Sequence, residues 1–220
     1  MITDERIAAF IESFDRDNTE FLYELEMRAC RDGIPVIKKP VQSLIRLLLD
    51  IKRPERILEV GTAVGFSSIL MAEYGPEECH ITTIEKYQKR ISTAKENLSL
   101  SGYGDRIALI EGDAADVLCE LRSRGSKFDF IFMDAAKGQY INFLEDVTEL
   151  LDDRGILLSD NVLQDGDVIE SRYAVTRRNR TIHSRMREYL FRITHDPCFS
   201  TVILPIADGV TISTKRTDRS

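Results

Sequence analysis

Between residues 56 and 160 the chain alternates short apolar runs with segments of helical spacing, and this alternation limits the fold strongly. Five apolar runs read as β-strands, at 56–61, 80–85, 106–113, 128–134 and 155–160. Four segments between them read as helices, at 66–75, 87–101, 114–124 and 139–151. Strands joined by helical crossovers form a parallel sheet covered on both faces, and such crossovers are almost always right-handed. The pattern therefore predicts an α/β, doubly wound, Rossmann-like fold.

Helical segments and a hairpin flank this pattern. Residues 3–51 are predicted to be helical, with separate helices near the start, from Thr19 to Gly33 and from Pro40 to Ile51. Residues 182–195 suit a helix whose apolar face consists of Ile182, Met186, Leu190 and Ile193. Residues 200–215 read as two strands around an Ala-Asp-Gly turn, which would close a mostly parallel, seven-stranded sheet with an antiparallel hairpin.

The length of 220 residues suits one domain. We expect it to span residues 1–220, with a helical N-terminal extension over 1–51 and a sheet core over 55–216. The sequence has no run of about 20 apolar residues, and its acidic start lacks the order of a secretory signal. The four isolated cysteines read as reduced, mostly buried thiols, and together these features predict a cytoplasmic protein.

The first predicted strand runs into "EVGTAVGFSS", a candidate cofactor loop. Gly61 and Gly65 allow a tight turn and a close backbone approach, and the next helix offers free N–H groups. The spacing is GxxxG, which differs from the dinucleotide fingerprint GxGxxG. Glu85 and Asp113 end the second and third strands, where acids meet ribose and base in such sheets. These strand ends predict a nucleoside-type cofactor; alternatively, the glycines serve only the turn and the acids are solvated.

Two further acids, Asp134 and Asp160, end the fourth and fifth strands, and Asn161 follows at once. If these strands are neighbours, both carboxylates lie at one edge of the sheet. Two carboxylates and an amide oxygen are hard ligands that suit Mg²⁺, and without a cation the two acids would repel each other. The alternative is that each aspartate is a helix cap or a strand-end charge.

The motifs "LEVGTAVGFSS", "TTIEKYQKRISTAKENL", "FIFMDAAKGQY" and "SDNVLQDG" resemble those of the cation-dependent class I O-methyltransferases related to the catechol and caffeoyl-CoA enzymes. The resemblance covers roughly residues 36–215. It implies S-adenosylmethionine as cofactor, with Glu85 at the ribose. The further cofactor-binding residues that it implies are Gly61, Ser67 and Ser68 at the methionine end, Asp113 and Ala114 at the adenine, and Ile37, Lys38 and Asp134.

The same resemblance implies that Asp134, Asp160 and Asn161 hold Mg²⁺ or another divalent cation. Asp134 and Lys137 would be catalytic, with Lys137 as the general base; the alternative for Lys137 is an exposed loop lysine. Family resemblance also implies a homodimer. The apolar N-terminal helices, with Phe10, Phe14, Phe21 and Leu22, would contribute to its interface or else simply cover the sheet.

The charge distribution bears on the substrate. The net charge is −7, yet the window Arg172–Arg192 holds seven arginines and one acid, so it carries +6 while the rest sums to −13. Clustered arginines suit phosphates, and Arg177, Arg178 and Arg180 are candidate RNA-binding residues. From "DNVLQDG" through "RRNRTI" to "PIADGVTISTK" the chain resembles the bacterial tRNA 5-hydroxyuridine methyltransferases. That resemblance implies methylation of a wobble 5-hydroxyuridine, in the anticodon loop of tRNA, to 5-methoxyuridine.

Two other hypotheses remain open at this point. One is an O-methyltransferase that acts on small catechols or caffeoyl-CoA-like phenols, for which a run of arginines is not needed. The other is a cofactor-binding protein without methyl transfer, such as a nicotinamide-dependent oxidoreductase. The GxxxG loop and the pair of acids count against this last hypothesis.

Overall fold

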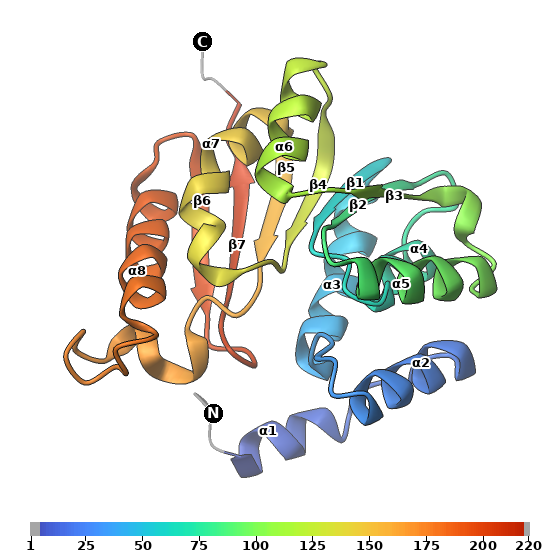
Figure 1. Ribbon diagram of the computed structural model, residues 1–220, viewed down its shortest axis with the longest axis horizontal. Coiled ribbons are helices and arrows are strands. Elements are labelled where there is room, and N and C mark those ends of the chain that lie inside the picture. Colours follow the sequence, from blue (N-terminus) through green and yellow to red (C-terminus); the bar gives the residue numbers. More distant parts are fainter. Residues whose placement is uncertain (1–4, 218–220) are drawn as a thin grey trace.

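A seven-stranded sheet forms the centre of the protein, in the order β3-β2-β1-β4-β5-β7-β6 (Figure 1). The computed structural model describes residues 5–217. The strands are β1 (Arg56–Val60), β2 (His80–Glu85), β3 (Ile107–Glu111), β4 (Phe128–Met133), β5 (Leu151–Ser159), β6 (Phe199–Leu204) and β7 (Val210–Lys215). The first five strands are mutually parallel, whereas β7 runs antiparallel to β5 and to β6. The predicted doubly wound sheet with a C-terminal hairpin is confirmed.

The helices agree with the predicted segments to within a few residues. They are α1 (Glu5–Glu12), α2 (Glu20–Arg31), α3 (Lys39–Lys52), α4 (Phe66–Tyr74), α5 (Gln88–Leu100), α6 (Ala114–Ser123), α7 (Tyr140–Leu150) and α8 (Arg180–His195). Short 3-10 turns are η1 (Gly104–Arg106), η2 (Lys137–Gln139) and η3 (Gln164–Ile169). The first two residues of the predicted helical region, 3 and 4, lie outside the described residues.

Two boundaries differ from the prediction for physical reasons. The strand that was predicted to begin at residue 155 begins at Leu151, because Leu151 pairs with Phe128 of β4. The next residue of β5 that pairs with β4 is Ile156, opposite Phe130, so the pairing between them is irregular. The irregular step contains charged residues that hide the strand from an apolar-run search. The last helix begins at Arg180, so Arg180 belongs to α8 and does not precede it.

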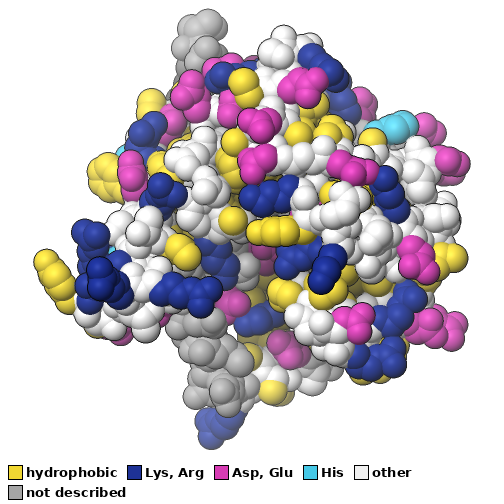
Figure 2. All heavy atoms as spheres, viewed as in Figure 1, with side chains coloured by type: hydrophobic (Ala, Val, Ile, Leu, Met, Phe, Trp, Pro, Cys, Tyr) yellow, Lys and Arg dark blue, Asp and Glu magenta, His cyan; other side chains and the backbone are white. Residues whose placement is uncertain are grey.

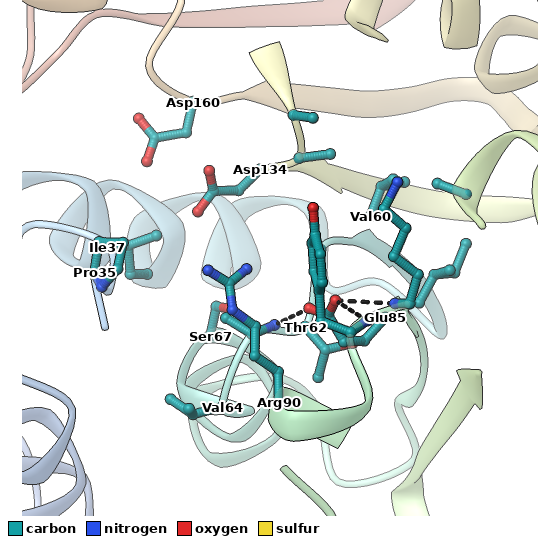
Figure 3. Close-up of a pocket in the computed structure, with 18 of the residues that line it drawn as sticks. Pro35, Ile37, Val60, Thr62, Val64, Ser67, Glu85, Arg90, Asp134 and Asp160 are labelled. Carbon is teal, nitrogen blue, oxygen red and sulfur yellow. Dashed lines mark hydrogen bonds between the residues drawn. The ribbon is translucent and has the colours of Figure 1, made fainter. Parts of the chain in front are cut away.

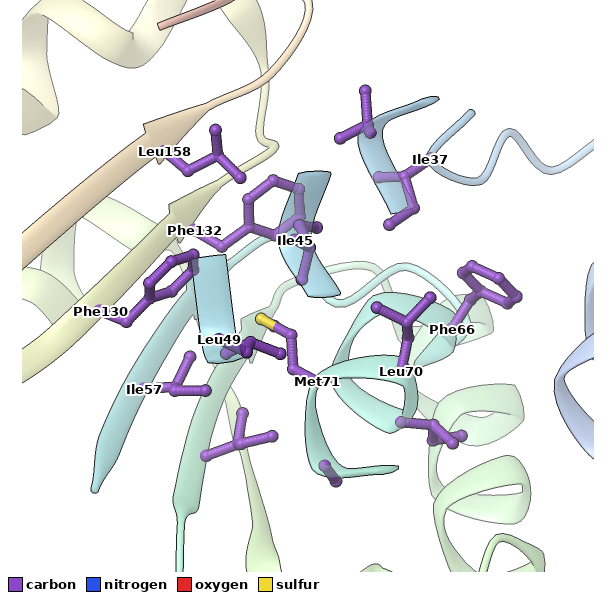
Figure 4. Packing of buried hydrophobic residues seen from close by; sticks show 14 of the residues in the cluster. Ile37, Ile45, Leu49, Ile57, Phe66, Leu70, Met71, Phe130, Phe132 and Leu158 are labelled. Carbon is purple, nitrogen blue, oxygen red and sulfur yellow. The ribbon is translucent and has the colours of Figure 1, made fainter. Parts of the chain in front are cut away.

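Side chains alternate between two cores, one on each face of the sheet. Phe130 and Phe132 of β4 pack toward α3 and α4, where Ile45, Leu49 and Met71 complete the cluster (Figure 4). Ile131 and Met133 face the opposite way, toward α6, α7 and α8. Strands buried on both faces have continuous apolar sequences, which explains why "FIFM" has no polar alternation.

The face of α8 that packs on the sheet consists of His183, Met186, Tyr189 and Ile193. The predicted stripe was therefore right for Met186 and Ile193, whereas Ile182 and Leu190 are only half-buried. No disulfide links the four cysteines within residues 5–217, and only Cys79 is buried, so the expectation of mostly buried thiols was wrong. No helix in this range combines the length and apolar composition that a membrane crossing needs.

Candidate active site

A cavity of about 800 Å³ opens at the carboxyl ends of β1, β2, β4 and β5 (Figure 3). This is the edge at which open α/β sheets bind their ligands. The cavity brings together eleven of the residues that the sequence singled out: Ile37, Lys38, Gly61, Ser67, Glu85, Asp113, Ala114, Asp134, Lys137, Asp160 and Asn161.

The loop between β1 and α4 forms the floor of the cavity and requires glycine at Gly61. Its φ is +111°, and a Cβ atom there would lie 2.1 Å from the carbonyl oxygen of Asp134. The backbone just after β1 therefore lies in close contact with the backbone just after β4. Gly65 also has a positive φ, of +86°, at the position that caps α4. Both glycines are thus needed for the turn, as their spacing suggested.

Glu85 is the last residue of β2, and its carboxylate holds the loop after β1 and the loop after β2 by hydrogen bonds. Its Oε2 accepts a hydrogen bond from Ala63 N, and its Oε1 accepts from Lys86 N and Tyr87 N, each at 2.9 Å. The carboxylate is buried yet lines the cavity, so its orientation is set before any ligand enters. Asp113 caps α6 through Ala115 N and pairs with Lys86 at 3.2 Å.

A buried polar network lies beneath this floor. The hydroxyls of Ser67, Ser68 and Thr83 all donate to the carboxyl group of Glu59, which is completely buried. Burial raises the pKa of Glu59 to about 7, although the three hydroxyl donors oppose the shift. Ser67 reaches the cavity, whereas Ser68 is fully buried and points to Glu59.

The acid pair lies where strand pairing continues past the ends of β4 and β5. Asp134 N donates to Val60 O and Asp160 N donates to Met133 O, each at 3.0 Å, so the two acids occupy neighbouring positions. Figure 3 shows both carboxylates directed into the same part of the cavity. The hydroxyl of Tyr140 lies 3.1 Å from Met133 O and 3.0 Å from Asp160 O, so it links the ends of β4 and β5.

The electrostatics of this pair favour a bound cation. Burial raises the pKa of Asp134 to about 6, against the opposing charges of Lys137 and Arg90. Burial, then the charges of Asp134 and Asp208, raise the pKa of Asp160 to about 7, against a hydrogen bond from Asn161 N. Two buried carboxylates with elevated pKa values, together with the side-chain amide oxygen of Asn161, form a donor set that fits a hard divalent cation.

Many residues that line the cavity were not among the predicted site residues, including Tyr87, Arg90 and Asp208. Tyr87 and Arg90 line it from the start of α5, and Figure 3 shows Arg90 reaching toward Asp134. Asp208 lines it from the β6–β7 turn. The signal for Asp208 was present in the Ala-Asp-Gly turn, but a turn sequence alone does not show which site it faces.

The predicted RNA-binding arginines do not line the cavity. Arg177 and Arg178 are exposed, and Arg180 is half-buried with its Nε 3.4 Å from Val175 O. Figure 2 shows Lys and Arg side chains gathered over the segment between η3 and α8, at the left of the view. The helix that follows packs on the cavity wall, because Arg185 Nη1 donates to Gly138 O of η2 at 3.2 Å.

Comparisons of the sequence and of the fold with known proteins both find similarity to O-methyltransferases. A family model described as O-methyltransferase matches residues 12–216. A catechol O-methyltransferase from Niastella koreensis is 32% identical over 141 residues, which cover 63% of this chain and 64% of that enzyme.

Two solved structures resemble the fold over nearly its whole length. A "putative caffeoyl-CoA O-methyltransferase" from Staphylococcus aureus has a TM-score of 0.87 and 31% identity, covering 96% of this chain and 100% of that one. A methyltransferase from Podospora anserina with bound SAH has a TM-score of 0.84 and 26% identity, covering 97% of this chain and 95% of that one.

Proposed function

The chain belongs to the O-methyltransferase family, and from this premise we propose that it transfers a methyl group from S-adenosylmethionine to a substrate hydroxyl with the help of a divalent cation. The observation that carries the proposal is that one cavity contains both the GxxxG loop with Glu85 and the acid pair. A methyl donor and an activated hydroxyl would therefore meet in the same space.

Several features support S-adenosylmethionine as the cofactor. The Podospora relative binds SAH, the demethylated product of that cofactor. In this chain Glu85 is oriented by three backbone N–H groups and suits ribose hydroxyls. Ser67, Ile37 and Lys38 would surround the methionine end, and Asp113 with Ala114 would contact the adenine.

Asp134, Asp160 and Asn161 would hold Mg²⁺ or another divalent cation. When bound, such a cation lowers the pKa of a coordinated hydroxyl and holds its oxygen toward the methyl group. Lys137 lines the same space, and its charge lowers the pKa of Asp134. We assign to its Nζ the proton that the substrate hydroxyl loses. A lysine can take this role only in its neutral form, and arginine cannot replace it.

The proposed substrate is the wobble 5-hydroxyuridine of tRNA, which would become 5-methoxyuridine. Its 5-hydroxyl and neighbouring 4-carbonyl offer two oxygens to one cation, as a catechol does. The exposed arginines before α8 support an anionic polymer, and anticodon-loop bases can be splayed out into a cavity. The arginine segment leads into a helix that packs on the cavity wall, which would put bound phosphates beside the site.

A second candidate is a small catechol or a caffeoyl-CoA-like phenol. The names of two relatives favour it, the catechol enzyme from Niastella and the caffeoyl-CoA-type protein from Staphylococcus. A CoA ester also carries phosphates, so arginines alone do not separate it from RNA. A catechol has none, and its methylation would not need the arginine segment.

The deciding assay compares methyl transfer to hydroxyuridine-containing tRNA, caffeoyl-CoA and catechol over a salt series. Replacing Arg177, Arg178 and Arg180 together by Ala should weaken tRNA binding and flatten its salt slope by about 2 units, since each phosphate contact contributes about 0.7 on single strands. Affinity for S-adenosylmethionine should not change. Wild-type preference for a small phenol, or full tRNA activity in the triple variant, would favour the second candidate.

A further inference from the structure

The turn between β6 and β7 is fixed to the loop that follows β5. Val162 N donates to Gly209 O, and Leu163 N donates to Asp208 O, each at 2.9 Å. Gly209 has a φ of +83°, and a Cβ atom on it would lie 2.4 Å from Cγ of Leu163. The turn therefore packs tightly against this loop, and this packing holds Asp208 next to Asn161.

The side chain of Asp208 joins two parts of the cavity wall. Its two carboxylate oxygens lie 3.0 Å from Nζ of Lys38, which comes from the segment before α3. Its Oδ2 accepts a hydrogen bond from Nδ2 of Asn161 at 3.5 Å, at the long end of the range. Asp208 is only 8% exposed, so the lysine offsets the desolvation of its charge.

The contact between Asp208 and Asn161 matters because the oxygen and the nitrogen of a side-chain amide have different chemistry. Only the oxygen of Asn161 can bind a cation, whereas its NH₂ group can only donate. An anion beside Nδ2 holds the nitrogen toward the β6–β7 turn and leaves Oδ1 for the cavity. Asn161 also has a left-handed backbone, with a φ of +55°, so its conformation depends on surrounding contacts.

Asp208 does not complete a three-carboxylate site with Asp134 and Asp160. Within residues 5–217 no group of three or more His, Cys, Asp or Glu side chains has an arrangement that could hold a metal ion. The side-chain contacts of Asp208 include the ammonium group of Lys38 and the amide of Asn161, a proposed metal ligand.

We propose that Asp208, itself held by Lys38, is a positioning residue that orients the Asn161 amide so that its oxygen faces the divalent cation. This inference rests on the proposed cation site. Groups that orient ligands in this way commonly change metal affinity by roughly 10- to 100-fold when they are removed.

The test measures Mn²⁺ binding by electron paramagnetic resonance, and the water bound to Mn²⁺ by proton relaxation, in wild type, Asp208→Ala, Asn161→Ala and the double variant. Asp208→Ala should lower Mn²⁺ affinity roughly 10- to 100-fold and let one more water reach the ion, as Asn161→Ala does. In the Asn161→Ala background, Asp208→Ala should add nothing further.

Two controls separate the outcomes. Asp152→Ala removes an aspartate that pairs with Arg56 at 2.8 Å, at the opposite end of the strands, and should leave Mn²⁺ affinity intact. If Asp208→Ala does not fold in EDTA, the same cycle is run with Asp208→Asn, whose smaller effect should also vanish beside Asn161→Ala.

Unchanged Mn²⁺ affinity in Asp208→Ala would overturn the inference, and so would effects of the two single variants that add in the double variant, because a direct ligand acts independently. In either case the proposed function would stand. A wild-type protein that binds no Mn²⁺ in this cavity would instead overturn the proposed cation site itself.

Discussion

At the scale of single residues, Glu59 shows how burial changes chemistry beneath the cavity. Its pKa is about 7 in the folded protein, against an ordinary value of 4.5, chiefly because it is buried. Between these values the native state keeps a proton that the unfolded state has lost. Stability from this group is therefore present at low pH and is lost as the pH rises toward 7.

Glu59→Gln removes this titration. From pH 4.5 to pH 7 the unfolding free energy of the variant should gain about 3 kcal/mol relative to wild type, since one pKa unit corresponds to about 1.4 kcal/mol. Denaturant unfolding of both proteins across this range measures the difference. A difference that does not vary with pH would show that the pKa of Glu59 is not raised in the folded protein.

The same residues show what local sequence could and could not reveal. Ser67 and Ser68 were both predicted to surround the methionine end. Both hydroxyls donate to Glu59, but neighbours on a helix point about 100° apart, and only Ser67 also lines the cavity. Asp134, Asp160 and Asn161 could be predicted because parallel strands end at one edge. Asp208 could not, because its place depends on how a distant hairpin pairs with β5.

At the scale of elements, the β1–α4 loop joins the cofactor side of the cavity to the acid pair. Gly61→Ala would put a methyl group onto the backbone of Asp134, 2.1 Å from its carbonyl oxygen. We expect a loss of stability on the order of 2 kcal/mol or more, together with weaker SAH binding, because the loop or β4 must move.

A matched control isolates the clash from backbone strain. Gly102 has a φ of +79°, and a methyl group added there would meet nothing within 4 Å, so Gly102→Ala carries strain without overlap. It should lose about 1 kcal/mol and keep its SAH affinity. Calorimetry and thermal unfolding compare the pair, and equal losses in both variants would argue against the close approach.

The elements themselves were readable from the sequence because their periodicity is local. The alternating strands and helices and the hairpin were predicted within a few residues. The helix α8 begins at Arg180, slightly before the predicted start at residue 182, and Asn179, a residue type common at helix starts, precedes it. The irregular start of β5 was missed because its pairing with β4, and not its composition, makes it a strand.

At the scale of the whole molecule, α1 leaves an apolar face in solvent. Figure 1 shows this helix projecting away from the sheet. Ile7, Phe10 and Ile11 of α1 and Phe14 just after it are each more than half exposed, and the rings of Phe10 and Phe14 meet edge to face at 5.0 Å. Leu22, expected to take part in an interface, is instead fully buried in the core.

We propose that α1 contributes to a homodimer, since exposed apolar patches of this kind mark interaction surfaces. Light scattering at micromolar concentration should give twice the chain mass of 25.1 kDa. Replacing Phe10 and Phe14 together by Ser should yield a folded monomer. A monomeric wild type would contradict the proposal.

The proposed methyl transfer needs both the cofactor and a cation at the acid pair. Its most direct test is the turnover of labelled S-adenosylmethionine with hydroxyuridine-containing tRNA and with catechol, with Mg²⁺ and after EDTA. We predict turnover with Mg²⁺ and a loss of at least about a hundredfold in EDTA. The same loss is expected in folded Asp134→Ala, Asp160→Ala and Asn161→Ala, because a Lewis acid contributes several kcal/mol. Full activity in metal-free protein would contradict the proposed mechanism.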